Sequence, residues 1–90
     1  MSTNYVVDQH FCRLEVTDTS INVRIRFRGS VSIPLHTVLA VGTARWRSTR
    51  VVQIETPQGV YEWALGDRAA EAARAVAEAA GVVLIPDSMA

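Results

Sequence analysis

The sequence predicts a mainly β domain of the α+β class, in which short antiparallel strands precede one C-terminal helix. Residues 51–56 and 60–65 alternate between apolar and polar side chains, and the turn residues at 57–59 join them into a hairpin. The same alternation runs through residues 11–28, whereas residues 67–80 are rich in alanine, which favours a helix. At 90 residues and 49% hydrophobic composition, the chain suffices for one small globular domain over residues 1–90.

The N-terminal strands are expected to pair as an antiparallel hairpin. Residues 5–7 are apolar and predict a short edge strand. Residues 11–17 and 21–28 are two alternating strands, and the turn residues 18–20 connect them. In the second of these strands one face carries Ile21, Val23, Ile25 and Phe27, and the opposite face carries Asn22, Arg24, Arg26 and Arg28.

The middle of the chain predicts two further strands and a corner. Residues 31–33 are extended, and Pro34 ends their ladder because proline has no backbone N–H donor. Residues 35–37 form the corner, and residues 38–46 resume as a strand that contains Gly42. A glycine inside a strand often marks a bulge or a bend, and a small closed barrel needs such bends at its corners.

The C-terminal helix is predicted over residues 67–80, with Asp67 as its N-cap and Gly81 as the C′ residue. One solvated stripe is expected from Arg68, Glu71, Arg74 and Glu78. The other faces are mostly alanine, which lets the helix lie flat and close across a sheet or a barrel mouth. Residues 82–85 predict a short strand or docked extension, and residues 86–90 a loose tail.

The basic residues are all arginine and are unevenly distributed. Residues 1–50 carry seven arginines against three acidic residues, whereas residues 51–90 carry two against six. Such asymmetry can mark an anion-binding half. The codons of a GC-rich genome also favour arginine and alanine. This codon bias would explain the absence of lysine without a functional reason, and it indicates that the host is a high-GC bacterium or its phage.

The location that the sequence predicts is cytoplasmic. No apolar stretch approaches the roughly 18 residues of a membrane span, and the polar start at residues 1–4 is unlike a signal peptide. Cys12 is the single cysteine, so the chain has no disulfide framework.

Two segments and the order of the elements resemble bacterial pleckstrin-homology-like (PH-like) domains. Residues 31–41 read Val-Ser-Ile-Pro-Leu-x-x-Val-x-x-Val, and residues 52–65 read Val-x-Ile-x-Thr-x-x-Gly-x-Tyr-x-Trp-x-Leu. The resemblance covers roughly residues 11–80 and implies a small bent antiparallel barrel, or two near-orthogonal sheets, capped by the helix. A full member has seven strands before its helix; six are predicted here, and residues 5–7 or a division of residues 31–46 would supply the seventh. The family mostly comprises modules that bind lipids, peptides or other proteins, or that serve in assembly.

An arginine ladder is the best candidate for a binding surface. Arg24, Arg26 and Arg28 are expected on one face of one strand, about 6–7 Å apart, which is close to the spacing of phosphates along a single nucleic-acid strand. A solvated sheet face is the competing interpretation. Cross-strand ion pairs with Glu15, Glu55 or Glu62 are another.

A second cluster, Arg45, Trp46 and Arg47, would extend this surface, with Trp46 as a stacking platform for a base. Strand alternation, however, places Trp46 on the face opposite its two arginine neighbours. A role in the core or at an interface is therefore favoured for Trp46.

The sequence predicts neither an enzyme nor a metal or cofactor site. His10 and His36 lack partners at metal-ligand spacing, and Cys12 lies on the apolar face of its strand, as a buried inert thiol does. The function expected is that of a non-enzymatic interaction module for a protein or peptide, self-association included, because an exposed strand edge is a template for an added strand. The alternative is binding of nucleic acid or anionic lipid through the arginine-rich sheet face.

Overall fold

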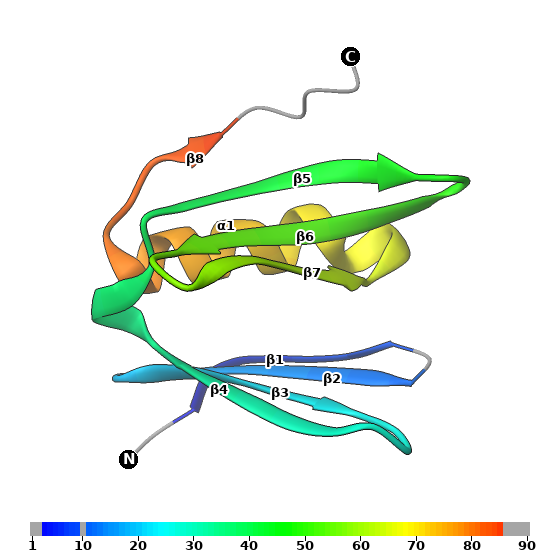
Figure 1. Ribbon diagram of the computed structural model, residues 1–90, viewed down its shortest axis with the longest axis horizontal. Coiled ribbons are helices and arrows are strands. Elements are labelled where there is room, and N and C mark those ends of the chain that lie inside the picture. The colour runs from blue at the N-terminus through cyan, green and yellow to red at the C-terminus, as the bar shows by residue number, and fades with distance from the viewer. Residues whose placement is uncertain (1–2, 10, 86–90) are drawn as a thin grey trace.

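The computed structural model of the protein describes residues 3–9 and 11–85, so the predicted tail at 86–90 and the side chain of His10 lie outside the described residues. The described chain folds into two four-stranded sheets and one α-helix (Figure 1). The strands are β1 (Thr3–Gln9), β2 (Cys12–Thr17), β3 (Ser20–Ile25), β4 (Gly29–Pro34), β5 (Ala40–Trp46), β6 (Thr49–Thr56), β7 (Gly59–Ala64) and β8 (Leu84–Ile85). The α-helix is α1 (Ala69–Ala80), and two short 3-10 helices are η1 (Leu35–Thr37) and η2 (Gly66–Arg68).

Sheet A contains the first four strands in the order β1-β2-β3-β4, all antiparallel. The predicted alternation of β2 is confirmed, because Leu14 and Val16 are fully buried while Arg13 is exposed. Leu14 lies directly opposite Val23 of β3, which is also buried. The edge strand β1 runs for seven residues and is longer than the predicted segment 5–7.

The predicted strand over residues 21–28 is wrong at its end. β3 stops at Ile25, and the next three residues form a turn in which the Arg28 N–H donates to the Ile25 carbonyl at 3.0 Å. Phe27 was expected on the apolar face, but its side chain is 91% exposed and its backbone has a φ of 66°. Gly29 follows with a φ of 101°, a conformation that glycine adopts without strain, and it reverses the chain into β4.

Sheet B has the order β7-β6-β5-β8 and contains the predicted 51–65 hairpin. Val52 and Ile54 of β6 are fully buried. Trp63 of β7 is 7% exposed, and its ring stacks on Tyr61 with a centroid distance of 5.6 Å. β8 confirms a short strand within the predicted 82–85 segment and pairs with β5 in parallel.

The bulge predicted at Gly42 is absent, because the pairing of β5 with β6 runs through Gly42 in regular register. Gly42 instead leaves room for β8. A Cβ placed on it would lie 3.4 Å from both the Cβ and the carbonyl oxygen of Ile85.

The two sheets do not close into a barrel, since the pairs between described strands join no strand of sheet A to a strand of sheet B. The chain crosses between the sheets at η1, the corner predicted at residues 35–37. α1 contacts β5 and β6 of sheet B as well as β1 and β2 of sheet A (Figure 1). Its buried face consists of small side chains, as the alanine pattern predicts: Ala69, Ala72, Ala73, Val76 and Ala77.

The two ends of α1 differ from one another in how well the sequence predicted them. Asp67 is not an N-cap: it lies inside η2, and no side chain caps the start of α1. The C-terminal prediction is confirmed, because Gly81 is left-handed with a φ of 71°. The Val82 N–H bonds to the Ala77 carbonyl at 3.1 Å and the Gly81 N–H to the Glu78 carbonyl at 3.3 Å, which together form a Schellman motif.

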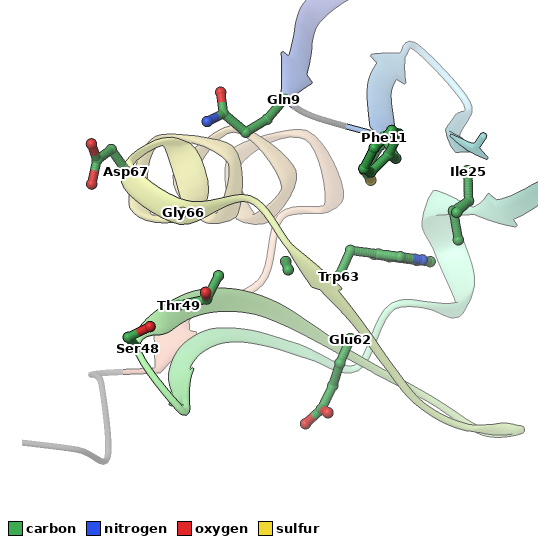
Figure 2. A pocket seen from close by; sticks show the side chains of 11 residues that line it. Gln9, Phe11, Ile25, Ser48, Thr49, Glu62, Trp63, Gly66 and Asp67 are labelled. Carbon is green, nitrogen blue, oxygen red and sulfur yellow. The ribbon is translucent and has the colours of Figure 1, made fainter.

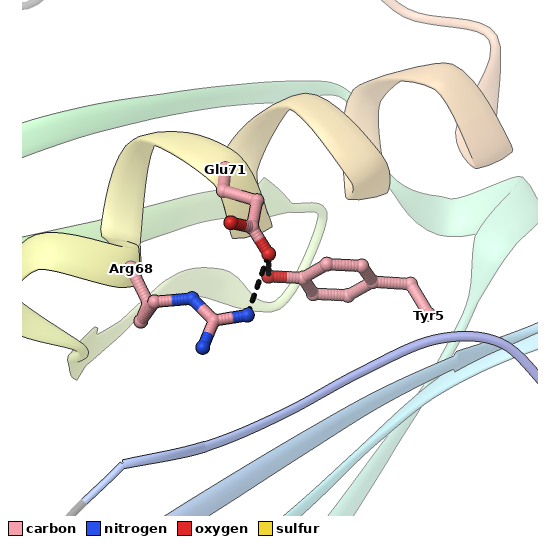
Figure 3. A network of polar contacts seen from close by, with 3 residues as sticks. All are labelled: Tyr5, Arg68 and Glu71. Carbon is pink, nitrogen blue, oxygen red and sulfur yellow. Dashed lines mark hydrogen bonds and ion pairs between the residues drawn. The ribbon is translucent and has the colours of Figure 1, made fainter.

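A polar contact fastens the start of α1 to sheet A (Figure 3). The Tyr5 hydroxyl of β1 donates to the Glu71 carboxylate at 2.7 Å, and the Arg68 guanidinium donates to the same oxygen at 2.7 Å. Burial, and then the bond to Glu71, raises the pKa of Tyr5 to about 12. The bond from Arg68, and then that from Tyr5, lowers the pKa of Glu71.

Candidate functional site: a cavity and hairpin turns at one end of the molecule

The β1/β2, β3/β4 and β5/β6 hairpins all end on the same side of the molecule, at the right in Figure 1. A cavity of about 600 Å³ lies between the two sheets at this end. Phe11 and Ile25 border it from sheet A, and Ser48 and Thr49 border it from sheet B. The hairpin ends therefore surround one cavity, and the sequence alone did not predict where this cavity lies.

The cavity has an apolar lining and a polar rim (Figure 2). Cys12 and Ile25 line it from sheet A, and the Trp63 ring extends from β7 toward Ile25. Gln9 at the end of β1 and Asp67 of η2 supply polar groups. A cavity of this size that combines an apolar lining with polar groups at its rim is typical of sites that bind a ligand or a peptide side chain.

The edge of β7 borders the same cavity. Glu62, Trp63 and Ala64 all line it, and β7 pairs with β6 on one side only. Within residues 3–9 and 11–85 no strand pairs with the other side of β7. Its backbone N–H and C=O groups on that side can therefore bond an added strand.

Cys12 is the single cysteine of the sequence, and its thiol lies buried in the cavity wall, as the sequence predicted. Burial, followed by the charge of Asp8, raises its pKa. The thiol therefore stays protonated near neutral pH and is a poor nucleophile.

The predicted arginine ladder is not formed. Only Arg24 lies on a strand, where it faces Arg13 of β2 directly, whereas Arg26 and Arg28 lie on the β3/β4 turn. Arg13 also forms an exposed ion pair with Asp8 at 3.6 Å. The three arginines predicted on one sheet face thus divide between a face and a turn, because β3 is shorter than its alternating pattern.

The hairpin ends carry arginines stacked on exposed aromatic rings. The Arg26 guanidinium lies 5.4 Å from the ring centre of Phe27 and 5.9 Å from that of Phe11. At the β5/β6 turn, Arg47 lies 4.8 Å from the ring centre of Trp46. Trp46 is 60% exposed, so the predicted role in the core is wrong and the role at an interface remains a prediction.

Both arginine clusters predicted from the sequence reach this end of the molecule, one on the β3/β4 turn and one at the β5/β6 turn (Figure 1). Arg45 faces Arg50 across β5 and β6, so sheet B repeats the like-charge pair of sheet A. Sequence reasoning missed Phe11 and Phe27 as surface aromatics. Gly29 was the signal for a turn that would have exposed Phe27, because glycine commonly marks turns.

The sequence matches no protein-family model, and none of the curated proteins shows significant similarity to it. The described part of the chain contains no helix that is both long enough and apolar enough to cross a bilayer.

Proposed function

We propose that the protein is a non-enzymatic interaction module that binds an extended peptide segment of a partner protein. The segment pairs with the edge of β7 and places side chains into the adjoining cavity. The observation that carries this proposal is the cavity of about 600 Å³ along an edge to which no described strand is paired.

Strand addition uses two sources of binding free energy. The backbone of the added strand bonds to the edge and supplies affinity, while alternate side chains enter pockets and supply specificity. On β7, Trp63 faces the interior and its neighbours Glu62 and Ala64 face outward. Every second side chain of an added strand would therefore point toward Cys12 and Ile25.

The order of the elements supports assignment to the PH-like class of binding modules. In the described part of the chain seven strands precede α1, four in sheet A and three in sheet B, and seven is the number in a full member of that family. The raised pKa of the Cys12 thiol in the cavity wall supports a binding role over nucleophilic catalysis.

Selection from a displayed library of random peptides tests the proposal. The selected peptides should bind the wild-type protein and slow the alkylation of Cys12, which lines the cavity. Ile25→Trp fills the cavity and should abolish binding. Leu39→Trp, an equally large change at an exposed position outside β7 and the cavity, should leave binding intact. Peptides that bind the Ile25→Trp protein as tightly as wild type would refute the proposed site.

A second function is favoured by the hairpin turns, which present Arg26 and Arg47 on the exposed rings of Phe27 and Trp46. Such turns suit binding of an anionic polymer or membrane surface, that is, a nucleic acid or anionic lipid.

Phosphatidylserine vesicles and a single-stranded oligonucleotide are the two probes for this second function. Arg26→Gln combined with Arg47→Gln should weaken binding and flatten its dependence on salt. Arg74→Gln, at an exposed position of α1, is the matched control for each single variant, because each removes one positive charge. Equal loss in Arg74→Gln, Arg26→Gln and Arg47→Gln would show that only overall charge matters and would rule out a site at the turns.

A further inference from the structure

Among the described residues, only part of the outer edge of β5 is paired with another strand. β8 pairs there with Val41 and Gly42, through Leu84 and Ile85. Among the described residues no strand pairs with residues 43–46 on that side. The edge thus continues beyond β8 toward the exposed Trp46 at the end of the hairpin.

β8 buries little of itself in reaching this edge. Leu84 is 38% exposed, Ile85 49% and the preceding Val83 80%, although all three are apolar. A two-residue parallel ladder contributes few hydrogen bonds, and parallel pairing is the less stable kind per residue. The free energy that holds β8 in place is therefore small.

The position on β5 at which β8 lies, called its seat below, is nevertheless specific: it is the backbone of Val41 and Gly42. Gly42 has no side chain where Ile85 lies, and the Cβ and carbonyl oxygen of Ile85 fill that space. A shallow cavity of about 180 Å³ adjoins this seat and is lined in part by Gln53, Glu55 and Val60. The edge is thus shaped to accept an isoleucine-sized residue opposite Gly42.

From this pairing we infer that the β5 edge is a second strand-accepting site, which the chain's own β8 occupies until a partner displaces it. The partner is an extended apolar segment of another protein that runs parallel to β5 and places a branched residue against Gly42. This segment gains more binding free energy than β8 does, because its backbone can also pair with residues 43–46 of β5. The site is separate from the cavity at β7, which lies at the opposite edge of sheet B.

The test uses the full-length chain and, as its probe, a labelled synthetic peptide of residues 82–90. When a site is blocked for most of the time, the apparent affinity falls by the fraction of molecules that are open. Ile85→Asp weakens β8 in its own chain and should tighten binding of the peptide by about tenfold or more, if β8 occupies the edge in roughly nine-tenths of molecules. Phe27→Asp also replaces an exposed apolar side chain, on the β3/β4 turn of the other sheet, and should leave peptide affinity at the wild-type value.

Two further variants locate the peptide. Gly42→Val, combined with Ile85→Asp, fills the seat and should abolish binding, whereas Ile25→Trp in the same background blocks only the β7 cavity and should have no effect. Hydrogen exchange provides a readout that does not depend on the Gly42 substitution: in the Ile85→Asp protein the peptide should slow exchange of the backbone amides around Val41 and Gly42, where β8 pairs. Equal affinity of the wild-type and Ile85→Asp proteins, or loss of binding in Ile25→Trp instead of Gly42→Val, would overturn the inference.

Discussion

The alanine face of α1 sets how closely the helix approaches the sheets, and enlarging one of its residues measures that closeness. Ala73 is fully buried, and its neighbours on the buried face are equally inaccessible. Ala73→Leu adds an isopropyl group where the helix contacts the sheets. Overpacking of this kind typically costs about 1–3 kcal/mol, because protein interiors have no spare volume.

A domain of this size loses roughly 4–8 °C of melting temperature per kcal/mol, so Ala73→Leu should melt about 4–24 °C below wild type in a circular-dichroism melt. Its total stability, about 5–13 kcal/mol from typical values per residue, leaves the variant folded at room temperature. Ala70→Leu is the matched control, since Ala70 is exposed on the same helix and the two residue types have similar helix propensity. Ala73→Leu that melts with Ala70→Leu would refute a close helix–sheet contact.

The remaining predictions concern titration. In an alkaline titration followed by tyrosinate absorbance, Tyr5 should ionise with a pKa of about 12, and Tyr5→Phe should remove that step. Because this pKa is raised in the folded state, the contribution of Tyr5 to folding stability is present below pH 10, its ordinary pKa, and is lost as the pH rises through 12. The lowered pKa of Glu71 gives the opposite sign: its contribution is present above the ordinary carboxyl pKa and is lost as pH falls through the lower folded value, so acid-induced unfolding should shift to higher pH in Glu71→Gln. Iodoacetamide should alkylate Cys12 slowly near pH 7 and faster as pH rises, and Asp8→Asn should accelerate the reaction by lowering the thiol pKa; a rate independent of Asp8 would show that burial alone sets it.

The sequence predicted those parts of the fold in which side chains alternate between core and water. The 51–65 hairpin and β2 are correct because each has one buried and one solvated face, which a pattern with a period of two reports directly. The left-handed conformation of Gly81 was equally predictable, since few residues other than glycine adopt that conformation at a helix end.

The sequence failed where local pattern and tertiary contact disagree. Arg26 to Arg28 continue the alternation of β3, yet the chain turns there, and Phe27 adopts a positive φ that its residue type disfavours. Gly42 suggested a bulge, but its role is to admit Ile85, a residue far away in the sequence. The cavity was unpredictable for the same reason, because it exists only where the ends of separate hairpins meet.

The separation of the two sheets has a mechanical consequence. Across the cavity the described strands share no hydrogen-bonded ladder, so the gap can widen or narrow by sliding of packed side chains without breaking a single interstrand bond. In a fully closed barrel the same change in spacing would break hydrogen bonds between paired strands. A change in the spacing of the sheets would therefore act on the side-chain packing between them and leave the strand ladders of both sheets intact.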